Sequence, residues 1–271
     1  MTNQAEKYEL FLELHRGRRP LLLPNAWDAG SAKLLQSLGF EAVATTSSGH
    51  AATLGRLDGA VTREEALEHA ASLVAATDLP VSADLENCFA DDPGGVAETV
   101  ALAIESGLAG CSIEDFTGNE HDPIYDRESA RARVAAAAEV AHRGRARLVL
   151  TARSENHLHG REDLEDTIAR LKAYEEAGAD VLYAPGLADP RDIERVVQAV
   201  SKPVNVLARP DGPSVNELEG LGVSRVSVGG AFAFTALGAL VEAASELLER
   251  GTYSFLDRSA LGARAARDAF G

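Results

Sequence analysis

Two short segments, VSADLE at residues 81–86 and GCSIED at residues 110–115, decide the fold of this chain. Each is an apolar run of strand length that ends in acidic residues, and an alanine-rich stretch with helical character lies between them. A strand followed by a helix and a second strand is the pattern of a parallel βαβ unit. The two segments therefore predict a parallel sheet with crossover helices.

The same unit recurs along the whole chain. We predict eight strands, at Leu21–Pro24, Ala42–Thr46, Val81–Asp84, Gly110–Glu114, Leu148–Ala152, Val181–Ala184, Val204–Leu207 and Arg225–Val228. Helical segments between them include residues 62–77, which open with the pattern of a capping box, and residues 161–177, which end before a glycine. Eight strand–helix units predict an α/β fold, a (β/α)8 TIM-type barrel. A doubly wound sheet is the alternative, but the first strand lacks the GxGxxG turn of dinucleotide-binding sheets.

Both ends of the chain fall outside the eight units. Residues before Leu21 predict an extra N-terminal helix, and residues after Thr252 predict a C-terminal helical appendage that packs on the barrel or on a neighbouring subunit. No proline-rich linker or change of composition divides the chain, so we expect residues 1–271 to form one domain. The run from Ala231 to Leu240 is more apolar on all sides than a surface helix should be, which indicates an oligomer.

The composition limits the possible partners and the compartment. The chain has 42 acidic and 26 basic residues, a net charge of −16, which opposes binding to nucleic acid and to anionic membranes. No apolar stretch of 18 residues and no signal-peptide pattern occurs, so we expect a cytoplasmic protein without a membrane span. The two cysteines, Cys88 and Cys111, are too few for a disulfide scaffold, which is consistent with a reducing compartment.

Acidic residues gather where the predicted strands end, and in such a barrel the active site lies at these ends. Asp84 and Glu86 follow the third strand, Glu114 ends the fourth, and Asp58 lies in the loop after the second. Asp84 and Glu86 are two residues apart on an extended segment, so we expect both side chains on the same side. Packed carboxylates repel one another unless a cation neutralises them, and oxygen ligands favour Mg²⁺. The alternative is that these acids form structural ion pairs with barrel arginines.

Arg153 is the arginine that we expect at a strand end facing the mouth. Its planar guanidinium suits a substrate carboxylate, although an ion pair with Glu114 or Asp84 is an alternative. The small-residue loop at 46–49 could receive an anionic oxygen on its backbone N–H groups. None of the four lysines ends a predicted strand, which argues against Schiff-base aldolase chemistry.

Six motifs in one order resemble the isocitrate lyase/phosphoenolpyruvate mutase superfamily, over about residues 22–248. They are PNAWD at 24–28, LGRLD at 54–58, DLE at 84–86, IED at 113–115, TAR at 151–153 and VGG at 228–230. The resemblance implies a barrel that binds Mg²⁺ and an α-keto carboxylate or its enolate. It also implies a homotetramer in which the eighth helix is exchanged between subunits.

The resemblance assigns a role to each candidate residue. It implies Asp84 and Glu86 as metal-site acids, directly or through water, Glu114 and Asp58 as completing the acidic shell, Arg153 as the partner of the substrate carboxylate, and Thr45, Thr46 and Ser47 as the loop that contacts the substrate. Among these residues, Arg153, Glu114 and Asp58 are the expected catalytic residues, and Glu114 is also an expected metal ligand. A usual member has Asp where Glu86 stands, one methylene shorter.

The chain departs from its lyase relatives in one loop. Isocitrate and methylisocitrate lyases carry a Lys-x-Cys-Gly-His loop after the fourth strand, but residues 116–125 here contain neither lysine nor cysteine. The strand-six glutamate of these lyases is replaced by Ala184-Pro185, and the gating loop of the phosphonate enzymes is missing too. The remaining candidate proton donors are His50, His121, Tyr125, His157 and His159. Cys88, in the loop after the metal-site acids, is a further candidate for the mouth.

These features favour a Mg²⁺-dependent lyase that acts on a small 2-oxo or 2-hydroxy di- or tricarboxylate through an enolate. Decarboxylation of an oxaloacetate-type substrate is favoured, because carbon dioxide leaves without a general base. Two alternatives stay open. One is an enzyme that acts on the phosphorus–carbon bond of a phosphonate, and the other is a barrel that binds an α-keto acid without turnover.

Overall fold

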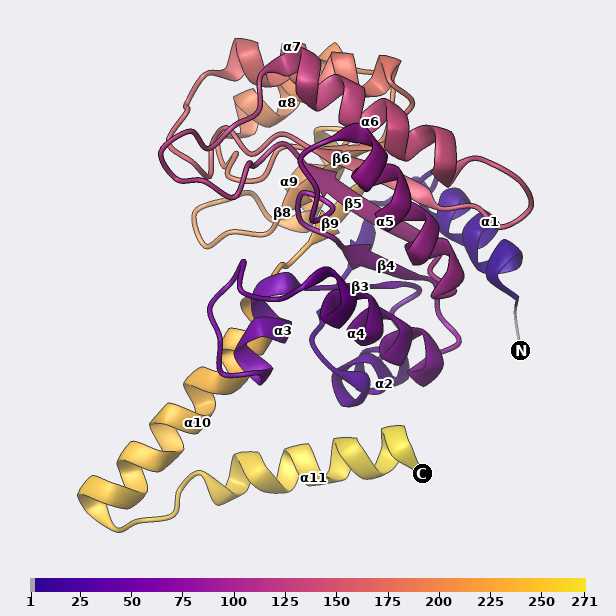
Figure 1. Ribbon diagram of the computed structural model, residues 1–271. Helices are drawn as coiled ribbons and strands as arrows, with labels where there is room; N and C mark the ends of the chain where they lie inside the picture. The colour runs from indigo at the N-terminus through magenta and orange to yellow at the C-terminus, as the bar shows by residue number, and fades with distance from the viewer. Residues whose placement is uncertain (1–2) are drawn as a thin grey trace.

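The computed structural model describes residues 3–271, in which parallel strands form a ring surrounded by helices (Figure 1). The strands are β1 Leu21–Leu23, β2 Asn25–Ala26, β3 Val43–Thr45, β4 Val81–Asp84, β5 Gly110–Glu114, β6 Val149–Arg153, β7 Val181–Tyr183, β8 Val204–Leu207 and β9 Arg225–Ser227. β1 pairs with β9 and β2 pairs with β3, so a first strand interrupted at Pro24 closes the ring. The predicted (β/α)8 barrel is confirmed, with the first of its eight strands broken in two.

Helices follow the strands as predicted. They are α1 Gln4–Leu14, α2 Ala29–Ser37, α3 Ser47–Thr53, α4 Arg63–Ala76, α5 Pro93–Glu105, α6 Arg127–Ala141, α7 Leu164–Glu176, α8 Pro190–Ala199, α9 Val215–Gly220, α10 Ala231–Arg250 and α11 Leu256–Phe270. The predicted capping box begins α4: the backbone N–H of Glu65 donates to the hydroxyl of Thr62, and the Glu65 carboxylate accepts from the Thr62 backbone N–H. The reciprocal bonds satisfy two N–H groups that a helix start leaves free.

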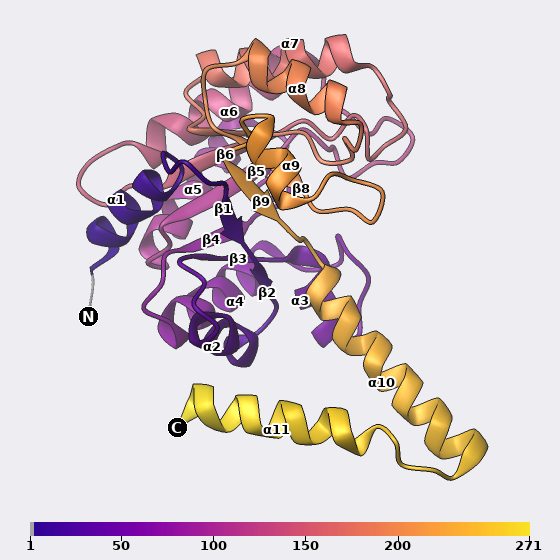
Figure 2. The same cartoon turned by 180° about the vertical axis from the view of Figure 1, so that it is seen from behind.

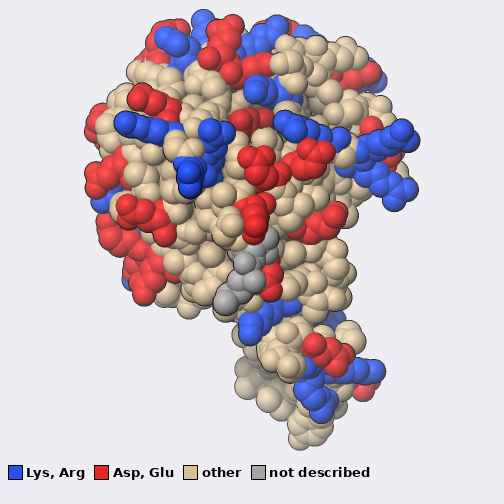
Figure 3. Space-filling model, turned by 90° about the vertical axis from the view of Figure 1, so that its right-hand side faces the viewer, with Lys and Arg blue, Asp and Glu red and all other residues tan. Residues whose placement is uncertain are grey.

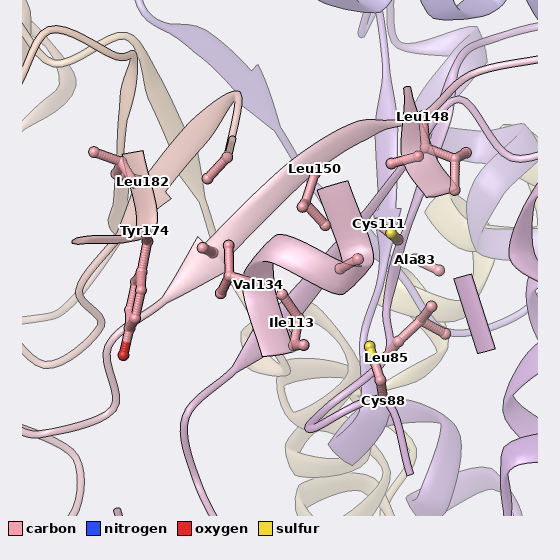
Figure 4. Packing of buried hydrophobic residues seen from close by; sticks show 14 of the residues in the cluster. Ala83, Leu85, Cys88, Cys111, Ile113, Val134, Leu148, Leu150, Tyr174 and Leu182 are labelled. Atoms are coloured by element: carbon pink, nitrogen blue, oxygen red, sulfur yellow. The ribbon is translucent and has the colours of Figure 1, made fainter. Parts of the chain in front are cut away.

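The main core lies between the outer faces of the strands and the surrounding helices. Leu85, Ile113 and Leu150 from the strands and their loops pack in one cluster with Tyr174 of α7 (Figure 4). Cys88 and Cys111 are fully buried free thiols in this cluster. The option of a mouth role for Cys88 is therefore wrong, because its side chain packs in the core and does not line the barrel cavity.

A second, smaller core fills the end of the barrel interior where the strands begin, called the lower end here. Phe11 of α1 is fully buried there, against Leu21, Val149 and Val181. Gly110 permits this packing, because a Cβ at this position would lie 2.7 Å from the Phe11 ring. The extra N-terminal helix thus closes the end of the barrel where the strands begin.

The last two helices extend away from the ring of strands, and the last one packs against α2. Both views show α10 running away from the ring and α11 returning beneath it toward α2 (Figures 1 and 2). From the side, α10 and α11 form a separate projection with much uncharged surface (Figure 3). Apolar side chains on α10 stay exposed, among them Phe234 at 50%, Leu240 at 64% and Leu248 at 88%.

By length and composition, α10 could cross a membrane, with a mean hydropathy of 1.5 over its most apolar window. The helix is not an uninterrupted apolar stretch, because Glu242 and Glu246 lie within it. Only 11% of the window is buried, so the helix is not a core helix of this subunit.

Candidate active site

A cavity of about 140 Å³ lies inside the barrel, on the side where the strands end. Its polar lining comes from most of the strands and their following loops: Asn25, Thr45, Thr46, Ser47, Ser48, Asp58, Ser82, Asp84, Ser112, Arg153, Tyr183, Asn205, Arg225 and Ser227. This position agrees with the usual active-site location in a (β/α)8 barrel. None of the residues lining the cavity is a lysine, in agreement with the argument against Schiff-base chemistry.

Arg153, the last residue of β6, is the centre of an ion-pair cluster. Its Nη1 donates to Asp84 Oδ1 at 2.8 Å, its Nη2 lies 3.1 Å from Glu114 Oε2, and its Nε donates to Glu155 Oε1 at 2.8 Å. The guanidinium carbon also lies 5.3 Å from the centre of the Tyr183 ring. The alternative for Arg153, an ion pair with Glu114 or Asp84, is therefore present in the structure, and with both acids. Burial by itself lowers the pKa of Arg153, but the three carboxylates outweigh burial and raise it above its ordinary value.

Asp84, the last residue of β4, is held from several sides. Its Oδ2 accepts from the backbone N–H of Ser47 at 3.3 Å and from the Ser47 hydroxyl at 3.1 Å. Its Oδ1 accepts from Ser112 Oγ at 3.4 Å as well as from Arg153, and its own N–H donates to Thr45 Oγ1 at 2.8 Å. The loop N–H that was a candidate for substrate binding thus orients a carboxylate in this structure.

Glu86 follows Asp84 through a turn and not along an extended strand, yet both residues line one small cavity. β4 ends at Asp84, and Glu86 adopts a left-handed φ of 50°, followed by left-handed Cys88 and Phe89. Non-glycine residues in this conformation are strained, and such strain gathers at functional sites. This cavity of about 10 Å³ also includes His50, and Asp84 and Ser47 line both it and the main cavity. Burial, with the charges of Asp84 and Asp58, raises the pKa of Glu86 to about 7.

The other two predicted acids differ in access to the cavity. Glu114 is 9% exposed and does not line the cavity, although its carboxylate contacts Arg153, which does. Burial raises the pKa of Glu114, and Arg153 opposes this rise. Asp58 lines the cavity, and burial raises its pKa while a hydrogen bond from Ser47 opposes the rise. Asp84 and Asp58 are therefore the acids that face a ligand directly.

The donor set can hold a hydrated Mg²⁺. Across residues 3–271 no three His, Cys, Asp or Glu side chains form a ready-made metal cage. Mg²⁺ does not require one, since it keeps several waters and usually takes one or two protein carboxylates. Asp84 and Asp58 supply oxygen donors on the cavity. Burial first, and then the charges of neighbouring acids, raise the pKa values of Asp58 and Glu86, and a bound cation would lower both.

The candidate proton donors lie away from the cavity. The Tyr125 hydroxyl donates to Asp91 at 2.7 Å, the His159 ring stacks on Phe116, and neither residue lines the cavity. His50 stacks on His69 with ring centres 3.8 Å apart and reaches only the small cavity beside Glu86. His121 and His157 also lie outside the lining of the main cavity.

Sequence reasoning missed three residues of the site. Glu155 pairs with Arg153 while only 2% exposed, and Tyr183 lies against the same guanidinium. Arg225, the first residue of β9, points into the barrel and lines the cavity. For Arg225 the sequence did offer a signal, a charged residue at the start of an otherwise apolar strand. A search restricted to the residues at strand ends does not find it.

Comparisons with known proteins agree with this fold and site. The family model described as phosphoenolpyruvate phosphomutase matches residues 11–248. An uncharacterized protein of Mycobacterium tuberculosis is 33% identical over 220 residues, which is 81% of each chain. The 2-methylisocitrate lyase of Halalkalibacterium halodurans is 30% identical over 215 residues, 74% of this chain and 67% of the relative.

A solved structure is also similar over almost the whole length. It is that of a Burkholderia cenocepacia J2315 protein provisionally assigned as a lyase/mutase, with a TM-score of 0.91 and 53% identity over 94% of this chain and 92% of the other. The matched region of the family model includes the whole barrel and all residues of the ion-pair cluster. The chain therefore belongs to the phosphoenolpyruvate mutase/isocitrate lyase superfamily.

Proposed function

We propose that this protein is a Mg²⁺-dependent carbon–carbon lyase that acts on a small 2-oxo or 2-hydroxy di- or tricarboxylate through an enolate. The observation that carries the proposal is the Asp84–Arg153 pair, which brings an oriented carboxylate and a guanidinium to the wall of one polar cavity. A carboxylate beside an arginine can bind a cation and a substrate carboxylate next to each other. The superfamily relatives described as lyases add support.

The residues of the chain divide the work in this proposal. Asp84 and Asp58 hold Mg²⁺, with Glu86 and Glu114 acting through water or as outer acids. When bound, Mg²⁺ supplies positive charge where negative charge develops on the substrate oxygen. Arg153 orients the substrate carboxylate, while Thr45, Thr46 and Ser47 form the wall beside it.

Decarboxylation of an oxaloacetate-type substrate is the reaction that fits this cavity best. Carbon dioxide leaves without a general base, and residues 116–125 contain no counterpart of the cysteine in the Lys-x-Cys-Gly-His loop of the lyases. The hydroxyl of Tyr125 and the rings of His121, His157 and His159 lie outside the cavity lining. Water is therefore the proton source that we assign to the resulting enolate.

The test is a substrate panel with and without Mg²⁺. We expect release of pyruvate from oxaloacetate, or cleavage of another 2-oxo or 2-hydroxy dicarboxylate, which is lost on chelation and restored by Mg²⁺. Asp84→Ala should abolish this turnover. Full Mg²⁺-dependent turnover by Asp84→Ala would contradict the site assignment. Binding of a keto acid with no product across the panel would favour a binding protein without catalysis.

Phosphonate chemistry is the second candidate function. A phosphonate needs several cationic partners, and the cavity is lined by a second arginine, Arg225, in addition to Arg153. The family model is also described as phosphoenolpyruvate phosphomutase. Formation of phosphate or phosphoenolpyruvate from phosphonopyruvate, in the same panel, would replace the carbon–carbon lyase by this reaction.

The proposed enzyme is a cytoplasmic homotetramer of single-domain subunits, with α10 and α11 packed on a neighbouring copy. Exposed Phe234, Leu240, Val241 and Leu248 give α10 an apolar surface that a second protein chain would bury. Light scattering should give a tetramer, and Leu240→Glu with Val241→Glu should give smaller species. A monomeric wild-type protein, or its recovery with membranes, would contradict this assembly.

A further inference from the structure

Arg225 is a buried arginine on the wall of the cavity. The residue is 4% exposed, and its backbone position in β9 lies next to Leu21 of β1 and Asn205 of β8. Its Nε donates to Asn205 Oδ1 at 2.9 Å, its Nη2 donates to Thr151 Oγ1 at 3.1 Å, and its Nη1 lies 3.2 Å from His15 Nε2. These contacts fix the guanidinium inside the barrel.

The partners of Arg225 are all neutral. His15 is neutral because burial, with the charge of Arg225, lowers its pKa to about 3. Over residues 3–271 no carboxylate lies within ion-pair distance of Arg225, whereas Arg153 on the same cavity has three. Burial lowers the pKa of Arg225 to about 10, so the guanidinium is still charged at neutral pH.

A buried cation without an acidic partner is costly. Removal of a charged group from water costs several kcal/mol unless an opposite charge compensates it. A guanidinium has five N–H donors, of which the three contacts above use three. Two donors and one uncompensated positive charge therefore remain for an anion that enters the cavity.

The negative groups of the cavity lie elsewhere. Asp84 and Asp58 are the acids of the lining, and both were assigned above to the metal. Arg153 is already neutralised by three carboxylates, so its capacity for a further anion is smaller than that of Arg225. The cavity thus has a metal-binding acidic side and a separate cationic position.

We propose that Arg225 binds a second anionic group of the substrate, distal to the 2-oxo acid end that Arg153 contacts. This inference rests on the proposed function and assigns one residue of this chain to the second anionic end that the candidate substrates share. The distal group is a carboxylate or a phosphonate, which a guanidinium binds in the same two-pronged manner. A 2-oxo acid with one anionic end leaves Arg225 uncompensated and binds more weakly.

The test compares ligands with one and two anionic ends in the Mg²⁺-loaded protein. Calorimetry measures the affinity for pyruvate, for 3,3-difluorooxaloacetate and for phosphonopyruvate, in the wild type, in Arg225→Gln and in Arg225→Lys. His15→Gln is the matched control, because it changes a neighbour of the guanidinium and keeps the charge. Thermal melts show that each variant is folded at the temperature used.

In Arg225→Gln we expect the affinity for the two-ended ligands to fall about 10- to 100-fold, while pyruvate changes by less than about 3-fold. Arg225→Lys should retain part of the preference, and His15→Gln should retain all of it. The ligand whose preference falls most identifies a carboxylate or a phosphonate as the distal group. If Arg225→Gln does not fold, the Lys variant decides, since it should weaken two-ended ligands several-fold and leave pyruvate unchanged.

Two outcomes separate the failures. Wild-type protein that binds none of the three ligands in the presence of Mg²⁺ would overturn the proposed function and the distal site together. Wild-type protein that binds them, with a substitution of Arg225 that weakens all ligands equally or none, would overturn the distal site alone. Arg225 would then be a structural residue of the barrel.

Discussion

The two ends of the barrel interior are built from opposite kinds of residue. At the lower end, Phe11, Leu21, Val149 and Val181 form an apolar plug closed by α1. At the mouth, Arg153 holds three carboxylates, and non-glycine residues adopt strained left-handed conformations. Burial of apolar side chains at the lower end stabilises the fold, whereas burial of closely packed charges at the mouth costs stability. One end of the barrel thus stabilises the fold and the other carries the candidate active site, as is usual in this fold.

The largest effect should follow from a change at the mouth. Asp84→Asn keeps the shape of the side chain but removes the charge that pairs with Arg153 and faces the proposed metal. We expect kcat/KM on the best substrate to fall on the order of 10³-fold, about 4 kcal/mol of transition-state stabilisation. The melting temperature should hardly change. A fall in stability with unchanged kinetics would mean that the mouth is structural.

The matching change at the lower end should act on stability instead. Phe11→Ala removes a fully buried ring between α1 and Gly110 and should lower the free energy of unfolding by about 3 kcal/mol. Activity per folded molecule should stay near that of the wild type below the melting transition. Urea unfolding and steady-state kinetics on one preparation measure both quantities. If Phe11→Ala lost activity without losing stability, the lower end would not have the purely structural role assigned to it.

A smaller effect concerns pH and the lower end. Because burial lowers the pKa of His15 from 6.5 to about 3, the unfolded chain takes up a proton in this window and the folded chain does not. The contribution of neutral His15 to the free energy of unfolding is complete above pH 6.5 and is lost as the pH falls toward 3. By pH 5 the loss is about 2 kcal/mol. The difference in unfolding free energy between wild type and His15→Gln should change with this slope. A pH-independent difference would show that the pKa of His15 is the same in the folded and unfolded chains.

A second pH effect has the opposite sign and belongs to the mouth. Burial and neighbouring acids raise the pKa of Glu86 from 4.5 to about 7, so the folded state binds more protons than the unfolded state between these values. In chelator-treated protein, stability should fall as the pH rises from 4.5 to 7, and Glu86→Gln should remove this fall. Denaturant midpoints at pH 5 and pH 8 measure it. If stability changed equally with pH in the wild type and in Glu86→Gln, a group other than Glu86 would be responsible for the change.

Local pattern predicted much of the barrel. The strand ends at Asp84, Glu114 and Arg153 were correct or one residue away, because apolar runs and their polar ends are properties of short segments. The turn after β4 was not predicted, since the sequence suggests an extended segment through Glu86, where the chain adopts a left-handed φ. The break at Pro24 was also missed, although a proline lacks the N–H that a strand pairing needs.

The sequence by itself determined the ring of strand–helix units, the position of the mouth and the residue types gathered there. Only the tertiary structure decided which charges meet. Arg153 and Glu114 are 39 positions apart and Arg225 and His15 are 210 apart, yet each pair is in contact because the strands and α1 bring them together. Pairing of charges depends on distance and burial in three dimensions, which no local pattern encodes. The uncompensated charge of Arg225 is therefore visible only in the folded barrel.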